Sequence, residues 1–387
     1  MRWMQIVLYD VSGGCDRALP PIRHEDQKKR RLAMQERVFM KGNEAIAEAA
    51  VRGGCRFFAG YPITPQNEIA EYLSWRLPEV GGAFVQAESE VASINMIYGA
   101  ASVGTLAITS SSSPGISLYS EGMSYLAGAE LPAVIISESR GGPGLGAIQP
   151  AQQDYLQATK AMGHGGFRCL VYAPSTIQEA VDLVYKACGK AADEHCPVVV
   201  LADGCTGAAM EAVTLPEMIE REDIEYVGQG GANYGYSEGH YLVTSYMPNP
   251  PLQEQFNIKL AEKYERWKKE EPDWEEYRME DAEVVVASYG VSARTAKTAI
   301  DSLREKGMKV GMIRPITVFP FPNEPFEKLD PSKVKHIIDV ELSIPAQMAD
   351  DVRLAVSNRI PVSTTGRSGG VMITYEEIER AIEEIAG

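Results

Sequence analysis

Two acidic side chains, Glu88 and Glu90, stand where a short apolar run ends and a run of small and apolar residues begins. From Glu90 to Ala100 nearly every side chain is small or apolar, which predicts a helix buried on most of its circumference. A carboxylate in the first turn of such a helix is favoured by the helix dipole and by free N–H groups. Either both acids are simple N-terminal caps, or one is a buried acid that shares a proton with a ligand.

Thr64 and Arg140 are further candidates, because each follows a predicted strand. The segment Tyr61–Pro65 contains two prolines, which exclude a helix or a central strand and predict a loop after a strand over 55–60. Ligands of open α/β sheets bind at this carboxyl edge. Thr64 either caps the helix that follows or offers its hydroxyl to a ligand. Arg140 either forms a surface ion pair or contacts an anionic ligand or partner.

Glycines at alternate positions follow Arg140, at Gly142, Gly144 and Gly146. They resemble a dinucleotide-binding fingerprint only weakly, because no orderly G-x-x-G leads into a helix and the segment does not follow the first strand. We interpret the glycines as allowing the backbone to close around whatever Arg140 contacts.

The elements that position these residues alternate between apolar strands and helices. Apolar strands without polar alternation predict an α/β fold with a parallel sheet covered by helices on both faces. We expect a tail, a first α/β domain, a connector rich in Pro and Gly, and a second, smaller α/β domain, at residues 1–35, 36–213, 214–281 and 282–387. Within the first domain the strands are predicted at 55–60, 104–109, 133–137, 170–172 and 197–204.

Composition excludes several classes of function. The chain has 387 residues, of which 45% are hydrophobic, and a net charge of -16, which argues against nucleic acid or an anionic membrane as a partner. No apolar run reaches the roughly 18 residues needed to cross a bilayer, so we expect a cytoplasmic protein. The 6 cysteines include no C-x-x-C pair and the 5 histidines no H-x-x-x-H pair, so neither an iron–sulfur cluster nor a metal site is expected on this chain.

Over residues 36–387 the chain resembles the alpha subunit of 2-oxoacid:ferredoxin oxidoreductases, and within that family the 2-oxoisovalerate (branched-chain) type. Tyr61-Pro62-Ile63-Thr64-Pro65 followed by the acid pair is the most specific part of the resemblance. The other shared motifs are Lys41-Gly42-Asn43-Glu44-Ala45, Gln86-Ala87-Glu88-Ser89-Glu90, Ser113-Pro114-Gly115, Arg140-Gly141-Gly142-Pro143 and Arg314-Pro315.

This resemblance implies a fold, a cofactor and roles for the candidates. The fold would be the pyrimidine-type thiamine diphosphate-binding domain followed by a transketolase C-terminal-like domain. Glu90 would hold and activate the aminopyrimidine ring, and Glu88 would be structural. Thr64 and Arg140 would bind the substrate carboxylate, as a hydroxyl donor and a charged donor suit an anion. Tyr61, Pro62 and Ile63 would line the cofactor site together with Glu90.

The resemblance also implies partners. The diphosphate motif of this cofactor class needs Gly-Asp-Gly and a downstream Asn to hold Mg²⁺. Ala202-Asp203-Gly204 and Asn233 match it poorly, and we interpret them as a decoy. Diphosphate and Mg²⁺ would therefore bind to a beta subunit, and iron–sulfur clusters to a ferredoxin-like subunit, with a gamma subunit, external ferredoxin and coenzyme A as further partners.

Two alternatives remain at this point. The substrate could be 2-oxoglutarate or pyruvate, because the pocket walls, for which we consider Tyr61, the segment after Gly141 and His164, are not placed by sequence. Alternatively, the chain could be a noncatalytic nucleotide-binding scaffold that uses its glycine loop.

Overall fold

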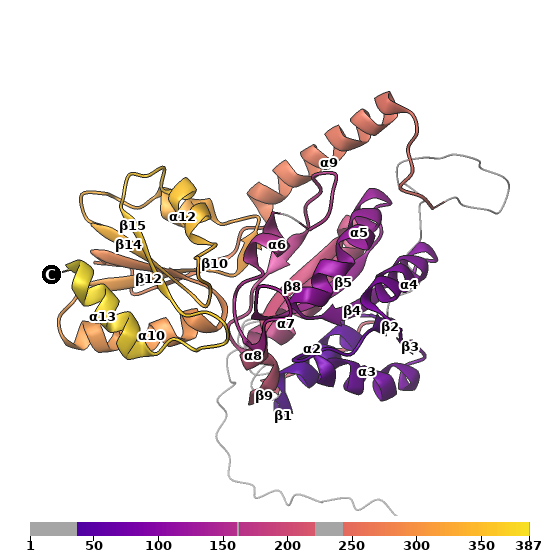
Figure 1. The fold of residues 1–387 in the computed structure, drawn as a ribbon, viewed down its shortest axis with the longest axis horizontal. Coiled ribbons are helices and arrows are strands. Elements are labelled where there is room, and N and C mark those ends of the chain that lie inside the picture. The colour runs from indigo at the N-terminus through magenta and orange to yellow at the C-terminus, as the bar shows by residue number, and fades with distance from the viewer. Residues whose placement is uncertain (1–36, 161, 221–242, 387) are drawn as a thin grey trace, which may run out of the picture. The chain divides into compact units, whose positions relative to one another are not determined.

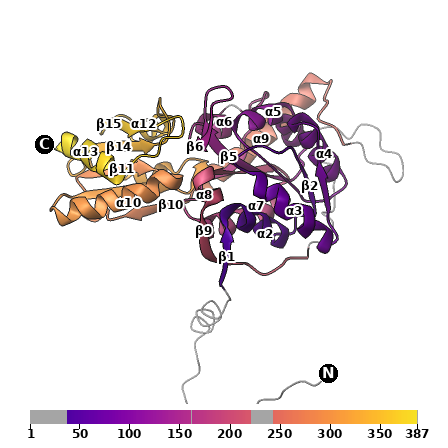
Figure 2. The same ribbon diagram turned by 60° about the horizontal axis from the view of Figure 1, so that its bottom comes forward.

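The computed structural model describes residues 37–160, 162–220 and 243–386, and they build two layered α/β parts around separate sheets (Figures 1 and 2). In the first sheet the strand order is β13-β7-β8-β5-β4-β2-β3, and the strands from β7 to β3 are parallel. These parallel strands are the predicted apolar runs together with β3: β2 (Phe57–Gly60), β3 (Ala83–Gln86), β4 (Ala107–Ser111), β5 (Ala133–Gly141), β7 (Leu170–Tyr172) and β8 (Pro197–Asp203).

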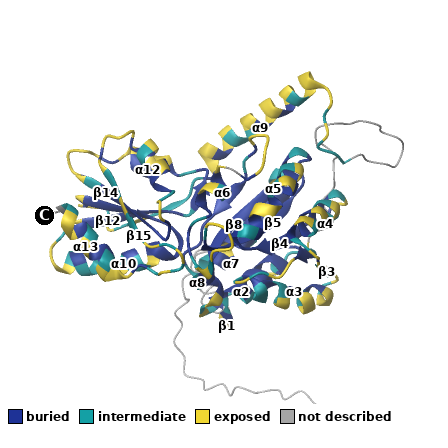
Figure 3. Cartoon of the chain, viewed as in Figure 1, coloured by how far each residue is buried: buried dark blue, intermediate teal, exposed yellow. Residues whose placement is uncertain are grey.

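Helices form a layer on each face of this sheet. Helix α2 (Gly42–Arg52) packs against α3 (Asn67–Glu79) and α7 (Ile177–Glu194), whereas α4 (Glu90–Ser102) packs against α5 (Ser113–Gly128). Every residue of β4, β5, β7 and β8 is buried between the two layers (Figure 3). The predicted fold class, a parallel sheet covered by helices, is therefore confirmed.

The second sheet has the strand order β10-β12-β11-β14-β15, in which only the edge strand β10 is antiparallel to its neighbour. Helices α10 and α13 pack against each other beside this sheet, and α11 packs against α12. The elements are β10 (Trp274–Tyr277), β11 (Val284–Ser288), α10 (Gly290–Glu305), β12 (Val310–Pro315), α11 (Asn323–Glu327), β14 (His336–Glu341), α12 (Ala349–Ala355), β15 (Val362–Gly366) and α13 (Tyr375–Ala386).

Smaller elements complete the described part of the chain. Strand β1 (Arg37–Lys41) pairs with β9 (Met210–Thr214), and β6 (Ala147–Pro150) forms an antiparallel hairpin with β5. Strand β13 (Thr317–Phe319) returns from the C-terminal part to pair with β7 in the first sheet. The remaining helices are α6 (Tyr155–Thr159), α8 (Gly204–Ala208) and α9 (Pro250–Glu270).

The described residues cover the predicted connector only in part and the predicted tail not at all. The connector predicted over 214–281 contains α9 and β10, and its residues 221–242, like the predicted tail 1–35, are not described. None of the helices within residues 37–160, 162–220 and 243–386 combines the length and apolar character needed to cross a bilayer.

The prediction that the helix after Glu90 is buried on most of its circumference is wrong. Helix α4 buries one stripe, and Val91 on its outer side is 44% exposed while Val103, just after its end, is 73% exposed. The buried face of a helix is predicted from the 3.6-residue period of its apolar residues. This period is not visible here, because small and apolar residues occur on every side of the helix. Strand β5 is also longer than predicted, because it runs through the polar residues Ser137–Arg140, all of which are buried.

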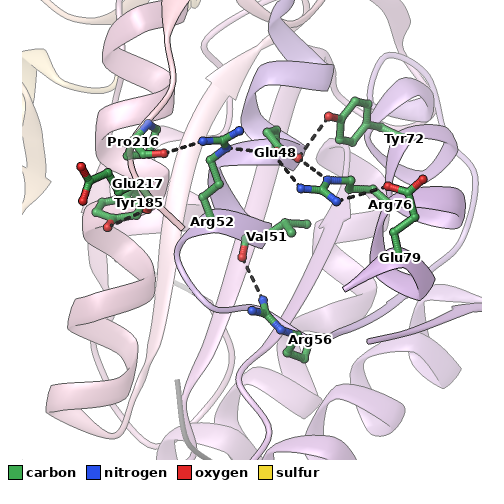
Figure 4. Close-up of polar contacts among 10 residues, drawn as sticks. All are labelled: Glu48, Val51, Arg52, Arg56, Tyr72, Arg76, Glu79, Tyr185, Pro216 and Glu217. Atoms are coloured by element: carbon green, nitrogen blue, oxygen red, sulfur yellow. Dashed lines mark hydrogen bonds and ion pairs between the residues drawn. The ribbon is translucent and has the colours of Figure 1, made fainter. Parts of the chain in front are cut away.

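A buried ion-pair network joins α2 to α3 on one side of the first sheet (Figure 4). Glu48 accepts hydrogen bonds from Arg52 Nε at 2.8 Å, Arg76 Nε at 2.9 Å and the Tyr72 hydroxyl at 3.1 Å. Burial works to raise the pKa of Glu48, but hydrogen bonds from Arg76 and Arg52 outweigh it and hold the pKa below its ordinary value. The network fixes the position of α3, into which the loop after β2 leads.

Candidate active site

The candidate residues lie at the carboxyl edge of the first sheet. The loop from Tyr61 follows β2, Glu90 follows β3, and Arg140 stands near the end of β5. Because these strands are parallel, their carboxyl ends meet at one edge. A backbone hydrogen bond of 3.0 Å from Ala87 N to Gly60 O ties the segment before Glu90 to the start of the loop.

Glu90 is the first residue of α4 and is 6% exposed. The preceding Ser89 caps the helix, because its hydroxyl accepts a hydrogen bond from Ala92 N at 3.2 Å. Glu90 therefore need not serve as the cap, and its carboxylate turns toward the start of α5. A Cβ on Gly115 would lie 2.6 Å from Glu90 Oε1 and 2.1 Å from Ser111 Oγ, so only glycine lets α5 approach this closely.

Buried polar groups lie near the Glu90 carboxylate. Burial raises the pKa of the Tyr119 phenol, and the negative charge of Glu90 adds to the shift. The Tyr119 hydroxyl is hydrogen bonded to Thr109 Oγ1 at 2.8 Å, whereas Ser111 Oγ and Ser112 Oγ are buried without a hydrogen-bond partner. Glu88, by contrast, is exposed before the helix.

Arg140 and Thr64 are brought together directly. The guanidinium of Arg140 is buried and donates from Nη1 to Thr64 O at 2.9 Å and from Nη2 to Leu145 O at 3.1 Å. Its Nε is buried without a partner, while the side chain of Thr64 belongs to an exposed residue of the loop. The arginine therefore holds the loop by its backbone, while Thr64 itself is an exposed residue.

The other predicted cofactor residues form the exposed part of the same loop. Tyr61 and Pro62 are exposed and Ile63 is partly buried. The loop is held from below by Gln66, whose Nε2 donates to Tyr61 O at 3.1 Å and whose Oε1 accepts from Ser110 Oγ at 2.5 Å. The side chains that the loop presents thus rest on a fixed backbone.

A buried serine–aspartate pair links Arg140 to α5, and sequence reasoning missed the aspartate. Ser113 Oγ donates to Asp154 Oδ2 at 2.5 Å and accepts from Arg140 N at 2.9 Å. Burial raises the pKa of Asp154, and the hydrogen bond from Ser113 and the charge of Arg140 partly offset that shift. Ser113 belongs to the Ser113-Pro114-Gly115 motif. The sequence around Asp154 shows no pattern that indicates a role, because its partner is 41 residues away.

The glycine loop is a hairpin turn between β5 and β6. Gly144 and Gly146 have φ of 73° and 61°, and a Cβ on Gly146 would stand 1.8 Å from Gly141 O. The turn delivers Leu145 O to Arg140, and no long helix begins in it. This geometry does not provide the helix N-terminus on which a dinucleotide fingerprint depends.

Three other predicted residues lie elsewhere or cannot be placed. His164 lines a separate groove with Asn95, Tyr98 and Tyr125, toward the far ends of α4 and α5. Asp203 caps α8, because its Oδ1 accepts from Cys205 N at 2.9 Å and Thr206 N at 3.1 Å. Asn233 lies outside the described residues.

Sequence reasoning also missed two buried polar residues near the loop, Asn43 on α2 and Glu138 on β5. The sequence did contain a pattern that could have indicated both. Asn43 is a polar residue in a helix of small residues, and Glu138 directly extends an apolar strand.

Comparison with known proteins gives the chain its relatives. A family model described as pyruvate flavodoxin/ferredoxin oxidoreductase, thiamine diphosphate-binding, matches residues 48–276, and the model of pyruvate:ferredoxin oxidoreductase core domain II matches residues 282–378. Ketoisovalerate oxidoreductase subunit VorB of Methanothermobacter marburgensis is 45% identical over 350 residues, covering 90% of this chain and 97% of that protein.

Two further relatives act on a different acid by name. The 2-oxoglutarate synthase subunit KorA of Methanocaldococcus jannaschii is 34% identical over 370 residues, covering 89% of this chain and 98% of that protein. The solved 2-oxoglutarate:ferredoxin oxidoreductase of Magnetococcus marinus, with 2-oxoglutarate, coenzyme A and succinyl-CoA bound, matches with a TM-score of 0.80 at 26% identity. The match covers 90% of this chain but only 65% of that one.

Proposed function

Starting from the premise that the chain belongs to the 2-oxoacid:ferredoxin oxidoreductase family, we propose that it is the alpha subunit of an enzyme that oxidatively decarboxylates 2-oxoisovalerate. The products would be an acyl-CoA and CO₂, and the electrons would pass to ferredoxin. The observation that carries the proposal is the buried Arg140 bound to the Thr64 loop, at the same sheet edge as the buried Glu90.

The surroundings of Glu90 fit the aminopyrimidine ring of thiamine diphosphate. A ring nitrogen needs a carboxyl partner and an exocyclic amine needs acceptors; Glu90 provides the first, and the unpartnered hydroxyl of Ser111 is available nearby. When bound, the cofactor supplies the nucleophilic carbon and the electron sink for decarboxylation. Glu90 would hold a proton at the ring nitrogen, and Tyr61, Pro62 and Ile63 would pack beside the ring.

Arg140 and Thr64 would bind the carboxylate of the 2-oxoacid. The Thr64 hydroxyl lies on an exposed part of the loop, and the guanidinium retains an unpartnered Nε. A charged donor beside a hydroxyl suits a carboxylate anion. The site would thereby orient the keto carbon of the substrate, with its side chain directed toward the hairpin between β5 and β6.

The hairpin supports a branched aliphatic substrate over 2-oxoglutarate. Its Leu145 and Ile148 are exposed apolar side chains, and Leu145 O binds Arg140 directly. A dicarboxylate would need a second cationic donor for its far end, whereas an isopropyl group gains from apolar contact. 2-Oxoglutarate remains the second candidate, because a relative at 34% identity is named for it.

The proposed complex needs other subunits. We propose that a beta subunit binds the diphosphate and Mg²⁺, that a ferredoxin-like subunit carries the iron–sulfur clusters, and that a gamma subunit, external ferredoxin and coenzyme A take part in the cytoplasm. The apolar side chains of Val91 and Leu118, exposed on α4 and α5 beside the site, support a covering subunit. The relatives are themselves named as subunits.

The test compares Glu90→Gln with Glu88→Gln in the purified complex. We expect Glu90→Gln to lower coenzyme A-dependent viologen reduction by at least about 100-fold, the usual contribution of positioned acid–base groups. Glu88→Gln is the matched control, because Glu88 is exposed two residues earlier, and it should retain nearly full activity. Near-normal activity of an assembled Glu90→Gln complex would refute the role of Glu90.

Substrate choice is measured in the same assay with 2-oxoisovalerate, 2-oxoglutarate and pyruvate. A higher kcat/KM for 2-oxoglutarate would replace the branched-chain proposal. If the complex oxidises none of them and the isolated chain binds NAD or ATP tightly, the scaffold alternative is correct.

A further inference from the structure

Asn43 holds the active-site loop at the carbonyl next to the one that Arg140 binds. It is the second residue of α2 and is fully buried, and its Nδ2 donates to Pro65 O at 2.9 Å and to Glu68 Oε2 at 3.0 Å. Arg140 Nη1 binds the preceding carbonyl, Thr64 O. Two consecutive carbonyls are thus held by two different elements, which fixes the peptide that carries Thr64.

The acceptor oxygen of Asn43 lacks a hydrogen-bond partner, and an acid stands opposite it. Asn43 Oδ1 is buried and unpartnered, and so are both carboxylate oxygens of Glu138. A Cβ on Gly207 would lie 2.5 Å from Asn43 Oδ1 and 2.8 Å from Glu138 Oε2, so both oxygens face the same point. Two acceptors cannot satisfy each other, whereas a protonated carboxyl and an amide oxygen can.

The surroundings of Glu138 favour its neutral form. The residue is fully buried, and burial raises its pKa well above the ordinary value, with the negative charges of Asp203 and Glu68 adding to the shift. Neither carboxylate oxygen of Glu138 has a hydrogen-bond partner, and Lys41 pairs with Glu68, at 3.5 Å, instead. A buried carboxyl without a cationic partner keeps its proton and can donate it in a hydrogen bond.

On the basis of the proposed function, we propose that Glu138 and Asn43 form a positioning pair that sets the Thr64–Pro65 peptide for binding of the 2-oxoacid carboxylate. Glu138 donates to Asn43 Oδ1, which fixes the amide plane so that Nδ2 points at Pro65 O. Glu138 stands two residues before Arg140 on β5, so their side chains share one face of the strand. One strand thereby controls both anchors of the loop.

The pair also explains the glycines around it. A Cβ on Gly42 would lie 1.9 Å from Thr206 O, and a Cβ on Gly207 would collide with both oxygens of the pair. Gly42 therefore lets α2 lie close to α8, and Gly207 leaves open the space beside the oxygens of Asn43 and Glu138. The Lys41-Gly42-Asn43 motif therefore has a role in shaping the site without contacting the substrate.

The experiment uses the assembled complex with three variants. Glu138→Met removes the hydrogen bond at nearly constant volume, Glu138→Gln retains a donor, and Asn43→Ser removes the link to Pro65 O. Asp339→Leu is the control for the loss of a buried carboxyl far from the loop, because Asp339 is another buried acid with unpartnered oxygens, on β14 of the second sheet. The measurements are KM and kcat for the 2-oxoacid and deuterium uptake of peptides covering residues 61–66.

We expect Glu138→Met and Asn43→Ser to raise KM about 10-fold, the effect of one hydrogen bond, and to speed exchange of the loop. Glu138→Gln should stay within about 2-fold of wild type in KM, which is the rescue expected of a neutral donor. Asp339→Leu should leave both readouts unchanged.

Equal impairment by Glu138→Gln and Glu138→Met, or unchanged KM and exchange in Glu138→Met, would overturn the proposal. If Glu138→Met fails to assemble, Asn43→Ser decides, because it keeps the strand intact. Deuterium uptake does not require turnover. A wild-type complex that oxidises no 2-oxoacid would therefore sink the proposed function, while the exchange data would still decide whether the pair holds the loop.

Discussion

Replacement of Arg140 by lysine should separate the charge of this residue from its geometry. The planar fork of Arg140 reaches Thr64 O and Leu145 O at once, at 2.9 and 3.1 Å, and Nε remains for a third partner. A lysine keeps the positive charge, but its single ammonium group cannot donate to both carbonyls with the geometry of the planar guanidinium. At least one hydrogen bond from a charged donor is lost, which is about 1.5–3 kcal/mol.

Since 1.4 kcal/mol corresponds to a factor of 10, Arg140→Lys should lower kcat/KM for the 2-oxoacid by about 10- to 150-fold. We expect the loss mainly in KM, because the loop and the substrate carboxylate lose a donor while Glu90 is untouched. The assay is coenzyme A-dependent viologen reduction by the assembled complex over a range of 2-oxoacid concentrations.

The matched control is Arg168→Lys. Arg168 also donates to a backbone carbonyl, Phe167 O at 3.0 Å, but it lies outside the carboxyl edge of the sheet. Its replacement should leave KM unchanged. An Arg140→Lys complex with the wild-type KM would show that the fork is not needed for substrate binding, and the assignment of Arg140 would fall.

Two further predictions concern stability, read as the thermal unfolding midpoint of the complex. Glu48→Gln should cost about 3 kcal/mol, the low end for breaking a buried ion pair, because Arg52 and Arg76 can be rehydrated. The pKa of Glu48 is lowered, so its contribution is present above about pH 4.3 and disappears as the pH falls through the folded-state pKa; a wild-type midpoint for Glu48→Gln would contradict this. Burial and the neighbouring Glu341 raise the pKa of Asp339 well above its usual range, so stability falls as the pH rises from about 3.9 through the folded-state pKa. Asp339→Asn should therefore raise the midpoint at pH 8 more than at pH 5, and the opposite order would count against a neutral Asp339.

The ends of the strands and the loops that follow them could be predicted from the sequence. Because the strands are parallel, their carboxyl ends lie at one edge of the sheet, so these loops could also be expected to lie together. Two prolines in Tyr61–Pro65 and the apolar run before Glu90 were enough to locate their segments. The family assignment made from such motifs is confirmed by the comparisons. The roles of Thr64, Arg140 and Glu90 stay predictions that the proposed variants test.

Pairings between distant residues could not be predicted. Ser113 meets Asp154 across 41 residues, and Arg140 meets Thr64 across 76. Such contacts depend on which strands are neighbours and on their register, and neither leaves a local pattern in one sequence. The same limit explains the error on α4, because the exposure of Val91 depends on what packs beside the helix.

The protonation of two acids near Arg140 on the chain affects whether its guanidinium can bind a substrate carboxylate. Glu138 lies two residues away on the same face of β5, and Asp154 is linked to Arg140 through Ser113. A fully ionised Asp154 would compete with an incoming carboxylate for the positive charge of Arg140. Burial pushes the pKa of Asp154 upward, which weakens that competition, and burial likewise raises the pKa of Glu138. The guanidinium therefore binds neutral carbonyls in the folded chain and keeps its positive charge for the anion that the site is proposed to receive.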